Sequence, residues 1–404
     1  MKISKRNLNF LALINGLIVL IVMSACESEP PTLPVENVID GVVGDIKTLS
    51  SGPPVFTATN FEAVPTGGGT FLYVGAGDNK SAATLVKFTN LPQSIQVNGA
   101  ELELRSTSNM GIINGNVDVT IHKVNDDWVD STVTADTFGN AFDPAIMSTF
   151  SFTVADTDTV VVPLDKTVIQ GWIDGTIENH GLYIQAPGAA YFKRINSRLA
   201  NDNRPVLRLF HEKEGVKDTT VFTASDDAFV FNLQQEPVQG PLYVGNGLEH
   251  RSILRFDFST IPRYANINLA ILTLQIDTLN SFLSKDAIFT FSIDAITKAA
   301  GDPEGVTLND FEDPFNDSLA TRRTSLFAFS YAVLDTSETI TVDLTPLMQN
   351  WTWNKYSNNG LVVVSRQNNL DLYRTAFFSK ETRPEKAPSV KVYYTVPADN
   401  DPGN

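Results

Sequence analysis

The chain repeats itself, and this repeat constrains the fold more than any other feature of the sequence. Residues 55–58 (VFTA) recur unchanged as residues 221–224, and residues 72–75 (LYVG) recur unchanged as residues 242–245. The offset between matched blocks grows only from 166 residues (55 to 221) to 183 residues (205 to 388). Two copies of one domain are therefore predicted, at residues 55–212 and 220–397. Five further blocks match in the same order: 85–88 with 253–256, 100–104 with 270–274, 169–172 with 348–351, 179–182 with 358–361, and 205–209 with 388–392.

Short runs of alternating apolar and polar residues fill each copy. Residues 101–105 (ELELR) and 272–276 (LTLQI) show this period of two, which is typical of half-buried β-strands. Gly, Pro, Asn and Asp cluster between the runs. One short helix is expected in each copy, at residues 164–172 and 344–351, where apolar residues are spaced three and four apart. The sequence predicts an all-β chain of two tandem antiparallel β-sandwiches of jelly-roll type.

The first 25 residues have the order of a secretory signal peptide. Three basic residues within the first six are followed by an apolar run to Met23, and the small residues Ser24 and Ala25 precede Cys26. Residues 23–26 (MSAC) resemble the lipobox of bacterial lipoproteins, in which the cysteine is acylated and becomes the new N-terminus. Cys26 is therefore the predicted lipidation site. The alternative is a retained helical anchor, which would leave the domains outside the same membrane.

Residues 26–54 are predicted to be the lipidated cysteine and a flexible tether, because prolines and acids are frequent there and aromatic residues are few. Glu27 and Glu29 resemble the surface-export signals of some Gram-negative lipoproteins. The expected location is the outer membrane, lipid-anchored and facing the cell surface. A spacer that only improves solubility is the alternative explanation for these two acids.

Cysteine content and charge exclude several functions. Cys26 is the only cysteine, so its acylation leaves no thiol for a disulfide, a thiolate metal site or a cysteine nucleophile. The formal net charge is −16, and an acidic surface of this kind repels nucleic acid and anionic lipid. No nucleic-acid partner is therefore expected, and the stability of the domains must come from packed cores.

The second copy resembles the DNRLRE domain. The resemblance is carried by residues 242–245 (LYVG), 251–259 (RSILRFDFS), 342–345 (VDLT) and 378–381 (FSKE). It implies a β-sandwich module of secreted bacterial proteins, some of which are described as carbohydrate-binding modules, including binders of acidic algal polysaccharides. The first copy is more divergent, with AATLVKF at residues 82–88 and NSRL at residues 196–199.

Motifs for catalysis are missing from the sequence. The four histidines, at positions 122, 180, 211 and 250, are far apart, and there is no Gly-x-Ser-x-Gly elbow, phosphate loop or dinucleotide fingerprint. We expect no enzyme activity and no cofactor. Two carboxylates could still meet in space, so a polysaccharide-cleaving enzyme stays as a weaker alternative. An acidic loop is either solvated or a calcium site, in which case its ligands would be Asp302, Glu304, Asp310 and Asp313.

Sugar sites combine aromatic rings with amide, carboxylate or guanidinium groups. Two basic-aromatic clusters have this composition, and the second would suit an acidic glycan. The alternative is that these side chains are structural, as we expect for Trp172 and Trp351 in the core. The candidates are Tyr191, Lys193, Arg194 and Arg198 in the first copy, and Arg251, Arg255, Tyr373 and Arg374 in the second.

The sequence therefore predicts a non-catalytic cell-surface lipoprotein that binds polysaccharide, including anionic polysaccharide, through tandem carbohydrate-binding-like domains. The alternative is a structural, adhesin or accessory protein that contacts other envelope proteins through sheet edges and loops. Exposed aromatic rings beside basic groups in a groove would favour polysaccharide binding, and a large flat apolar patch would favour a protein partner.

Overall fold

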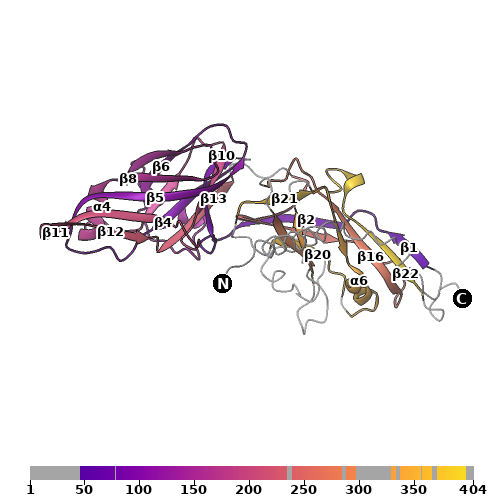
Figure 1. The fold of residues 1–404 in the computed structure, drawn as a ribbon. Helices are drawn as coiled ribbons and strands as arrows, with labels where there is room; N and C mark the ends of the chain where they lie inside the picture. The colour runs from indigo at the N-terminus through magenta and orange to yellow at the C-terminus, as the bar shows by residue number, and fades with distance from the viewer. Residues whose placement is uncertain are drawn as a thin grey trace, which may run out of the picture.

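The computed structural model describes residues 46–77, 79–233, 239–283, 288–296, 329–333, 337–355, 357–365 and 371–396. These residues form large antiparallel sheets and three short α-helices, arranged in two lobes (Figure 1). This confirms the predicted all-β, sandwich-like fold. Among the helices that the structure describes, none has the length and hydropathy that a membrane span requires.

The first lobe comprises residues 64–233. Its strands are β3 (Phe71–Gly77), β4 (Lys80–Lys87), β5 (Gln96–Gly111), β6 (Val117–Lys123), β7 (Ser148–Phe152), β8 (Asp158–Leu164), β9 (Leu182–Gln185), β10 (Tyr191–Asn196), β11 (Val206–Lys213), β12 (Val216–Thr223) and β13 (Asp226–Leu233). They are ordered β12-β11-β5-β10-β3-β4-β9-β6-β7, with β13 paired to β4 and β8 paired to β5. Two helices belong to this lobe, α3 (Ala135–Phe138) and α4 (Lys166–Asp174).

The second lobe comprises residues 46–63 together with the described residues from 239 to 396. Its first sheet has the order β1 (Ile46–Ser50), β22 (Ser389–Thr395), β16 (Asn266–Gln275) and β19 (Thr339–Asp343). Its second sheet has the order β18 (Phe329–Val333), β17 (Phe289–Ala295), β20 (Leu361–Ser365), β15 (Leu248–Arg255), β14 (Leu242–Gly245) and β21 (Arg374–Phe377), and β2 (Phe56–Ala63) pairs with β15. Helix α6 (Thr345–Thr352) and the 3-10 helix η3 (Pro384–Lys386) complete it.

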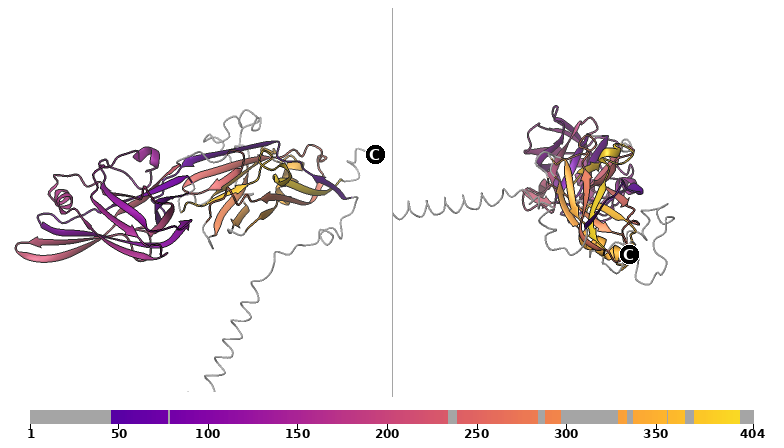
Figure 2. Two further views of the ribbon diagram at one scale, coloured as in Figure 1. Left: turned by 90° about the horizontal axis from the view of Figure 1, so that it is seen from above. Right: turned by 90° about the vertical axis from the view of Figure 1, so that its right-hand side faces the viewer.

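The two repeats exchange their first two strands. β2 begins the first repeat but pairs with β15 of the second, from Phe56 opposite Arg255 to Ala63 opposite Leu248. β13, its equivalent in the second repeat, pairs with β4 of the first. The preceding strands follow the same rule, since β1 pairs with β22 and β12 pairs with β11. In Figure 2, β2 (indigo) lies along the second lobe, among strands coloured orange and yellow.

This exchange changes the domain limits expected from the sequence. The limits 55–212 and 220–397 describe the repeated sequence, whereas each folded lobe contains strands from both repeats. The structure also corrects two expectations about the segments that flank the predicted domains. The predicted tether, 26–54, ends in a strand, because Ile46–Ser50 forms β1. The polar stretch at 212–219 is a hairpin within the first lobe, with its turn at Glu214 and Gly215, whose φ angles are 52° and 80°.

The repeated sequence blocks form the same local structure in both lobes, except for the block at 55–58, which begins β2, and its match at 221–224, which ends β12. Both predicted helices are present as α4 and α6, and each contributes a glutamine that binds a neighbouring backbone. The Gln170 side chain accepts from the Val97 N–H at 2.7 Å and donates to the Ile95 carbonyl at 3.1 Å. Gln349 accepts from the Ile267 N–H at 2.8 Å and donates to the Ala265 carbonyl at 3.0 Å. These bonds fix each helix to the edge of its sandwich.

The lobes also share one apolar core. Tyr73, Phe192 and Phe229 of the first lobe belong to the same buried cluster as Leu242 and Leu248 of the second. Burial of this apolar surface joins the lobes directly, in addition to the exchanged strands.

The connection from β2 to β3 is fixed where it crosses between the lobes. The buried Thr66 hydroxyl donates to the Phe229 carbonyl and accepts from the Phe229 N–H, at 2.5 and 2.9 Å. The crossing segment therefore provides hydrogen-bond partners for both backbone polar groups of Phe229 in β13, its N–H and its carbonyl.

A glycine begins the same strand in both repeats because a side chain would not fit. Gly181 and Gly360 have φ angles of 88° and 102°. A Cβ atom would lie 2.4 Å from the Val86 carbonyl oxygen at Gly181, and 2.7 Å from the Leu254 carbonyl oxygen at Gly360. Each glycine thus allows its strand to pair closely with the preceding strand of the same sheet.

Replacing Gly360 or Gly181 with alanine is expected to lower the free energy of unfolding by about 2 kcal/mol or more, because it combines backbone strain with a clash against backbone. Thermal unfolding of the soluble chain measures this. Gly188→Ala is the matched control, since a Cβ there meets nothing within 4 Å. Equal melting temperatures for all three variants would contradict this explanation of the repeated glycine.

Candidate functional site

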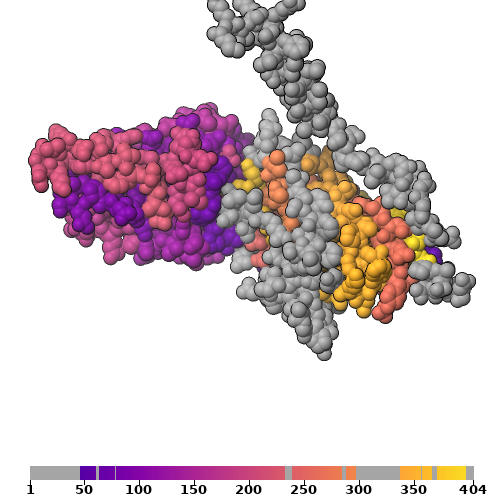
Figure 3. Space-filling model, turned by 60° about the horizontal axis from the view of Figure 1, so that its bottom comes forward, coloured from indigo at the N-terminus to yellow at the C-terminus, as the bar shows by residue number. Residues whose placement is uncertain are grey.

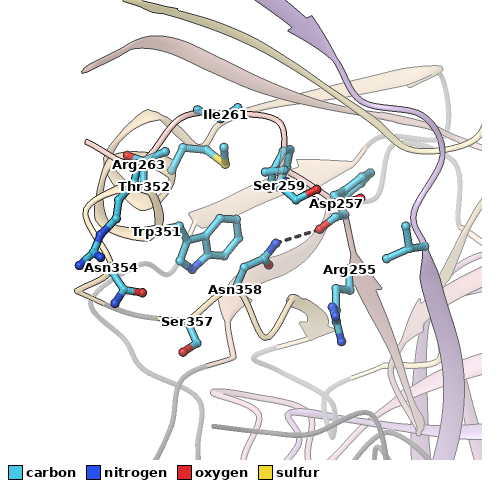
Figure 4. Close-up of a pocket in the computed structure, with 14 residues that line it drawn as sticks. Arg255, Asp257, Ser259, Ile261, Arg263, Trp351, Thr352, Asn354, Ser357 and Asn358 are labelled. Atoms are coloured by element: carbon cyan, nitrogen blue, oxygen red, sulfur yellow. Dashed lines mark hydrogen bonds between the residues drawn. The ribbon is translucent and has the colours of Figure 1, made fainter. Parts of the chain in front are cut away.

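A cavity of about 660 Å³ opens on the second lobe, beside helix α6 (Figure 4). In the space-filling view, the surface around α6 (orange) is exposed on this lobe (Figure 3). The cavity is formed by the end of β15 and the segment after it, by α6 and the segment after it, and by one residue before β2. Its lining comprises Val55, Arg255, Phe256, Asp257, Phe258, Ser259, Ile261, Arg263, Met348, Trp351, Thr352, Asn354, Ser357 and Asn358.

Three aromatic rings line the cavity in series. The rings of Phe256 and Phe258 are 6.0 Å apart with planes inclined by 29°, and those of Phe258 and Trp351 have the same separation and inclination. Phe256 is buried in the core, whereas Phe258 and Trp351 are partly exposed. Because the buried Leu347 and Met348 face the core, α6 brings Trp351 to the edge of that core. The exposed part of these rings offers a flat apolar surface.

Charged groups surround these rings. Arg255 and Arg263 supply two guanidinium groups, and Asp257 supplies one carboxylate. The Arg263 guanidinium lies 4.8 Å from the centre of the Tyr264 ring, which supports it at the surface. A hydrogen bond from the Ser259 N–H, at 2.9 Å, lowers the pKa of Asp257, so this group stays ionised at neutral pH. The cavity therefore carries one more positive than negative side chain, within a strongly acidic protein.

Two buried polar atoms of the lining have no hydrogen-bond partner. They are Nε1 of Trp351, which can only donate, and Oδ1 of Asn358, which can only accept. The other polar atom of the Asn358 amide is engaged, because Nδ2 donates to the Phe256 carbonyl at 2.8 Å (Figure 4). Buried polar groups are normally paired, so unpaired atoms beside a cavity indicate where a ligand would bind. Both atoms are buried, so a ligand hydroxyl would reach them only after the lining side chains moved apart.

At the corresponding position of the first lobe, more of the polar atoms have hydrogen-bond or ion-pair partners. Asn179 matches Asn358, and its Nδ2 donates to the Phe88 carbonyl at 2.7 Å, but its Oδ1 accepts from the Gly181 N–H at 3.1 Å. Lys87 matches Arg255 and forms an ion pair with Asp127 at 2.6 Å. Trp172 matches Trp351 and is buried in the core, with its Nε1 also without a partner. The side-chain amide of Asn179 is therefore fully engaged, whereas Oδ1 of Asn358 has no partner among the described residues.

The predicted cluster of the first repeat is structural. Tyr191 and Lys193 are 1% and 0% exposed. The Tyr191 hydroxyl donates to the Gly115 carbonyl at 2.7 Å, and the Lys193 ammonium donates to the Ala155 carbonyl at 2.5 Å. Arg194 lies over the Phe71 ring at 4.1 Å and donates to the Thr107 hydroxyl at 3.1 Å. Tyr191 and Lys193 are therefore enclosed by packed protein, which contradicts the prediction that they form a sugar-binding surface, whereas Arg194 is half-buried.

Arg198, the last candidate of the first repeat, belongs to a buried ionic cluster. The Arg198 guanidinium pairs with Asp130 and lies 3.7 Å from the Asp227 carboxylate. The backbone N–H of Arg198 donates to the same Asp227 carboxylate at 2.5 Å. Burial raises the pKa of Asp227 to about 7, against the opposing effect of Arg198. Arg198 is thus paired with one partly exposed acid, Asp130, and lies beside one buried acid, Asp227.

One of the four candidates in the second repeat lines the cavity. Arg255 does so, whereas Arg251, Tyr373 and Arg374 are 9%, 8% and 7% exposed. Arg251 lies 3.4 Å from the Glu249 carboxylate. Arg374 lies over the Tyr243 ring at 5.0 Å and donates to the Asn280 carbonyl at 3.1 Å. The expected basic-aromatic surface is therefore not formed by these four residues together.

The predicted calcium ligands Asp302, Glu304, Asp310 and Asp313 lie outside the described residues. Within the described ranges, no three His, Cys, Asp or Glu side chains gather closely enough to hold a metal ion. Trp128 is 8% exposed, and its indole donates to the His180 carbonyl at 2.8 Å. It packs in the core of the first lobe.

The sequence reasoning missed Phe258, Arg263 and Asn358 as site residues, and it assigned Trp351 to the core. The sequence contains one feature that could have indicated Phe258 and Asn358. Phe258 and Asn358 lie within or beside blocks that match between the repeats, and Phe258 replaces Asn90 of the first copy. A polar residue in one copy and a partly exposed aromatic residue at the equivalent position of the other mark a surface at which the two copies differ.

Comparison with known proteins adds little. No protein-family model matches the chain, and no curated protein matches it. Among solved structures, a likeness is found to the Macrobrachium rosenbergii nodavirus, over 92% of this chain and 97% of that one, with 10% sequence identity and a TM-score of 0.15. A TM-score this low carries no argument about fold or function. The likeness to the DNRLRE domain stays a prediction.

Asp227→Asn is expected to raise the melting temperature more at pH 8.5 than at pH 5. The pKa of Asp227 in the folded state, about 7, lies above the ordinary value of 3.8 for an aspartate, so the folded protein binds more protons than the unfolded chain between these values. Stability therefore falls as pH rises through this window, and the cost of the buried charge is fully present above it. The amide removes that cost. Equal effects of the substitution at both pH values would contradict this assignment.

Proposed function

We propose that this protein is a non-catalytic, lipid-anchored protein of the bacterial cell surface that binds polysaccharide in the cavity beside Trp351. The observation that supports this most is the combination of two partly exposed rings with two unpaired polar atoms in one cavity. Sugars present apolar faces that stack on aromatic rings and hydroxyls that both donate and accept hydrogen bonds. Trp351 and Phe258 provide the rings, and Trp351 Nε1 and Asn358 Oδ1 provide the donor and the acceptor.

The charges around the cavity favour an acidic sugar. Guanidinium groups bind carboxylates with short, charge-assisted hydrogen bonds, and Arg255 and Arg263 offer two of them. The excess of acids elsewhere in the chain repels an anionic polymer at long range, so binding depends on this local basic pair. We therefore propose a polysaccharide that carries carboxylates as the ligand class. The sequence resemblance to carbohydrate-binding modules supports the same class.

Attachment at Cys26 places this site on a membrane surface. The sequence order of signal peptide, lipobox-like residues 23–26 and acidic residues 27 and 29 supports acylation and display on the outer membrane. In this role the protein holds polysaccharide at the cell surface for a neighbouring enzyme or transporter. No step of catalysis is assigned to it.

Native gels that contain alginate, a polyuronate, test the binding of polysaccharide. The soluble chain should begin at Glu27, so that it keeps β1. We expect alginate to retard the chain, and added salt to weaken the retardation because charges contribute to it. Gels with xylan and gels without polymer are the controls. Absence of retardation in every gel would contradict the proposed function.

Arg263→Ala is expected to weaken the affinity for alginate roughly tenfold, because it removes a charge-assisted contact. Arg383→Ala is the matched control, since Arg383 is also an exposed arginine over a ring, that of Phe378, and does not line the cavity. Trp351→Ala should abolish retardation, whereas Trp353→Ala, at an exposed tryptophan outside the lining, should not. Melting curves show which variants are folded. Equal affinities for Arg263→Ala and Arg383→Ala would contradict the site.

Cys26→Ser is expected to move the full-length protein from the detergent phase to the aqueous phase in a detergent-partition experiment, because the acyl chains supply the membrane affinity. Mass spectrometry of the mature N-terminus shows whether the cysteine carries lipid. Partition of the serine variant into detergent to the same extent as the unchanged protein would contradict the predicted anchor.

A further inference from the structure

One wall of the cavity belongs to the segment that joins β1 to β2. Val55 lines the cavity, and its N–H donates to the Arg255 carbonyl at 2.8 Å. On the other side of this segment, the Ser51 N–H donates to the Val390 carbonyl and the Ser51 hydroxyl accepts from the Val390 N–H, both at 2.8 Å. The segment therefore bridges β22 and β15 across the edge of the cavity, and the cavity is complete only when the segment is seated.

The same segment is the part of the second lobe that lies closest in sequence to Cys26. Among the described strands, β1 is the outer strand of its sheet and pairs with β22, and β2 pairs with β15. The residues of β1 are all partly or fully exposed. An edge strand with few buried side chains is the type of element that opens locally while the rest of a domain stays folded. A pull through the anchor would act on β1 first, because Ile46 is its first residue.

We propose that ligand binding in the cavity and the seating of β1 and β2 on the second lobe are thermodynamically coupled, so that bound polysaccharide holds the anchor-side strands in place. This inference rests on the proposed function. Opening of the segment removes Val55 from the wall and removes β2 as the strand partner of Arg255, so the ligand binds the seated state. By linkage, the ligand lowers the population of the opened state by the factor 1 + [L]/Kd.

The coupling has a consequence for a protein that is held by its N-terminus. When the cavity is occupied by a polymer, the connection between the lobe and its lipid anchor is at its strongest. When the cavity is empty, β1 and β2 are held by their strand pairing and by side-chain contacts such as that of Thr59 with Ser252, without the contribution of the ligand. Ligand binding would therefore stabilise the seated strands that lead to the anchor, and seating of these strands would favour ligand binding. Val55 and Arg255 link the two, without any contact between the ligand and the lipid.

The first lobe contains an internal control. β12 and β13 are the equivalents of β1 and β2, and they are joined by a segment with equivalent hydrogen bonds. The Ser225 N–H donates to the Lys87 carbonyl at 2.8 Å, as the Val55 N–H does to Arg255. Neither strand contributes to the cavity. Any effect of ligand that is specific to the site should thus appear in β1 and β2 and not in β12 and β13.

Hydrogen exchange of the soluble chain from Glu27, read by mass spectrometry with and without alginate oligomers, tests the coupling. At about 100 times the Kd, amides of β1 and β2 that exchange by local opening should slow by up to about 100-fold, while those of β12 and β13 stay unchanged. The Trp351→Ala variant should show neither binding nor slowing.

The possible results separate the two claims. Binding of the oligomers without slowed exchange in β1 and β2 would overturn the coupling and leave the proposed function in place. Slowing to the same extent in β12 and β13 would also overturn the coupling, because the effect would not be specific to the cavity. Absence of binding would overturn the proposed function and, with it, the inference that rests on it.

Discussion

The pairing of β2 with β15, and of β13 with β4, is the interaction on which the rest of the structure depends. Each exchanged strand is matched along eight residues to a strand of the other repeat. Backbone groups in a sandwich must find partners, and each lobe satisfies the edge of its sheet with a strand from elsewhere in the chain. The first lobe is thereby inserted into the second, between β2 and β14. The shared apolar core at the junction then joins the lobes through side chains as well.

The two lobes share one framework of helix and sheet contacts. The two repeats hold their helices with the same glutamine contacts and their sheets with the same glycine, so the framework is common to both. The lobes differ in the surface side chains that surround this framework. In the first lobe Lys87 is bound by Asp127, and the Asn179 amide is fully engaged. In the second lobe, Phe258 and Trp351 line a cavity, and the side-chain oxygen of Asn358, Oδ1, has no hydrogen-bond partner. Val55, from the segment that joins β1 to β2, completes the wall of this cavity.

Sequence patterns predicted the local structure but not the pairing. The alternation in residues 101–105 predicted β5 and the helical spacing predicted α4 and α6, because both are local properties. The partner of β2 could not be read from the chain, since β4 and β15 are equivalent and suit it equally. Lys193 and Arg374 were taken for ligand-binding residues because their charge suggested a surface. Both lie on strands that are covered on both faces, and burial of a long cationic side chain depends on tertiary packing.

Chemical cross-linking of engineered cysteines tests the strand exchange most directly. In a Cys26→Ser background, Ser50→Cys is combined either with Lys391→Cys, its observed partner in β22, or with Arg208→Cys, the equivalent position in its own repeat. A short thiol-reactive reagent and mass spectrometry of the monomer identify the linked peptides. The account predicts an intramolecular link between residues 50 and 391 and none between residues 50 and 208. A link between residues 50 and 208 alone would contradict it.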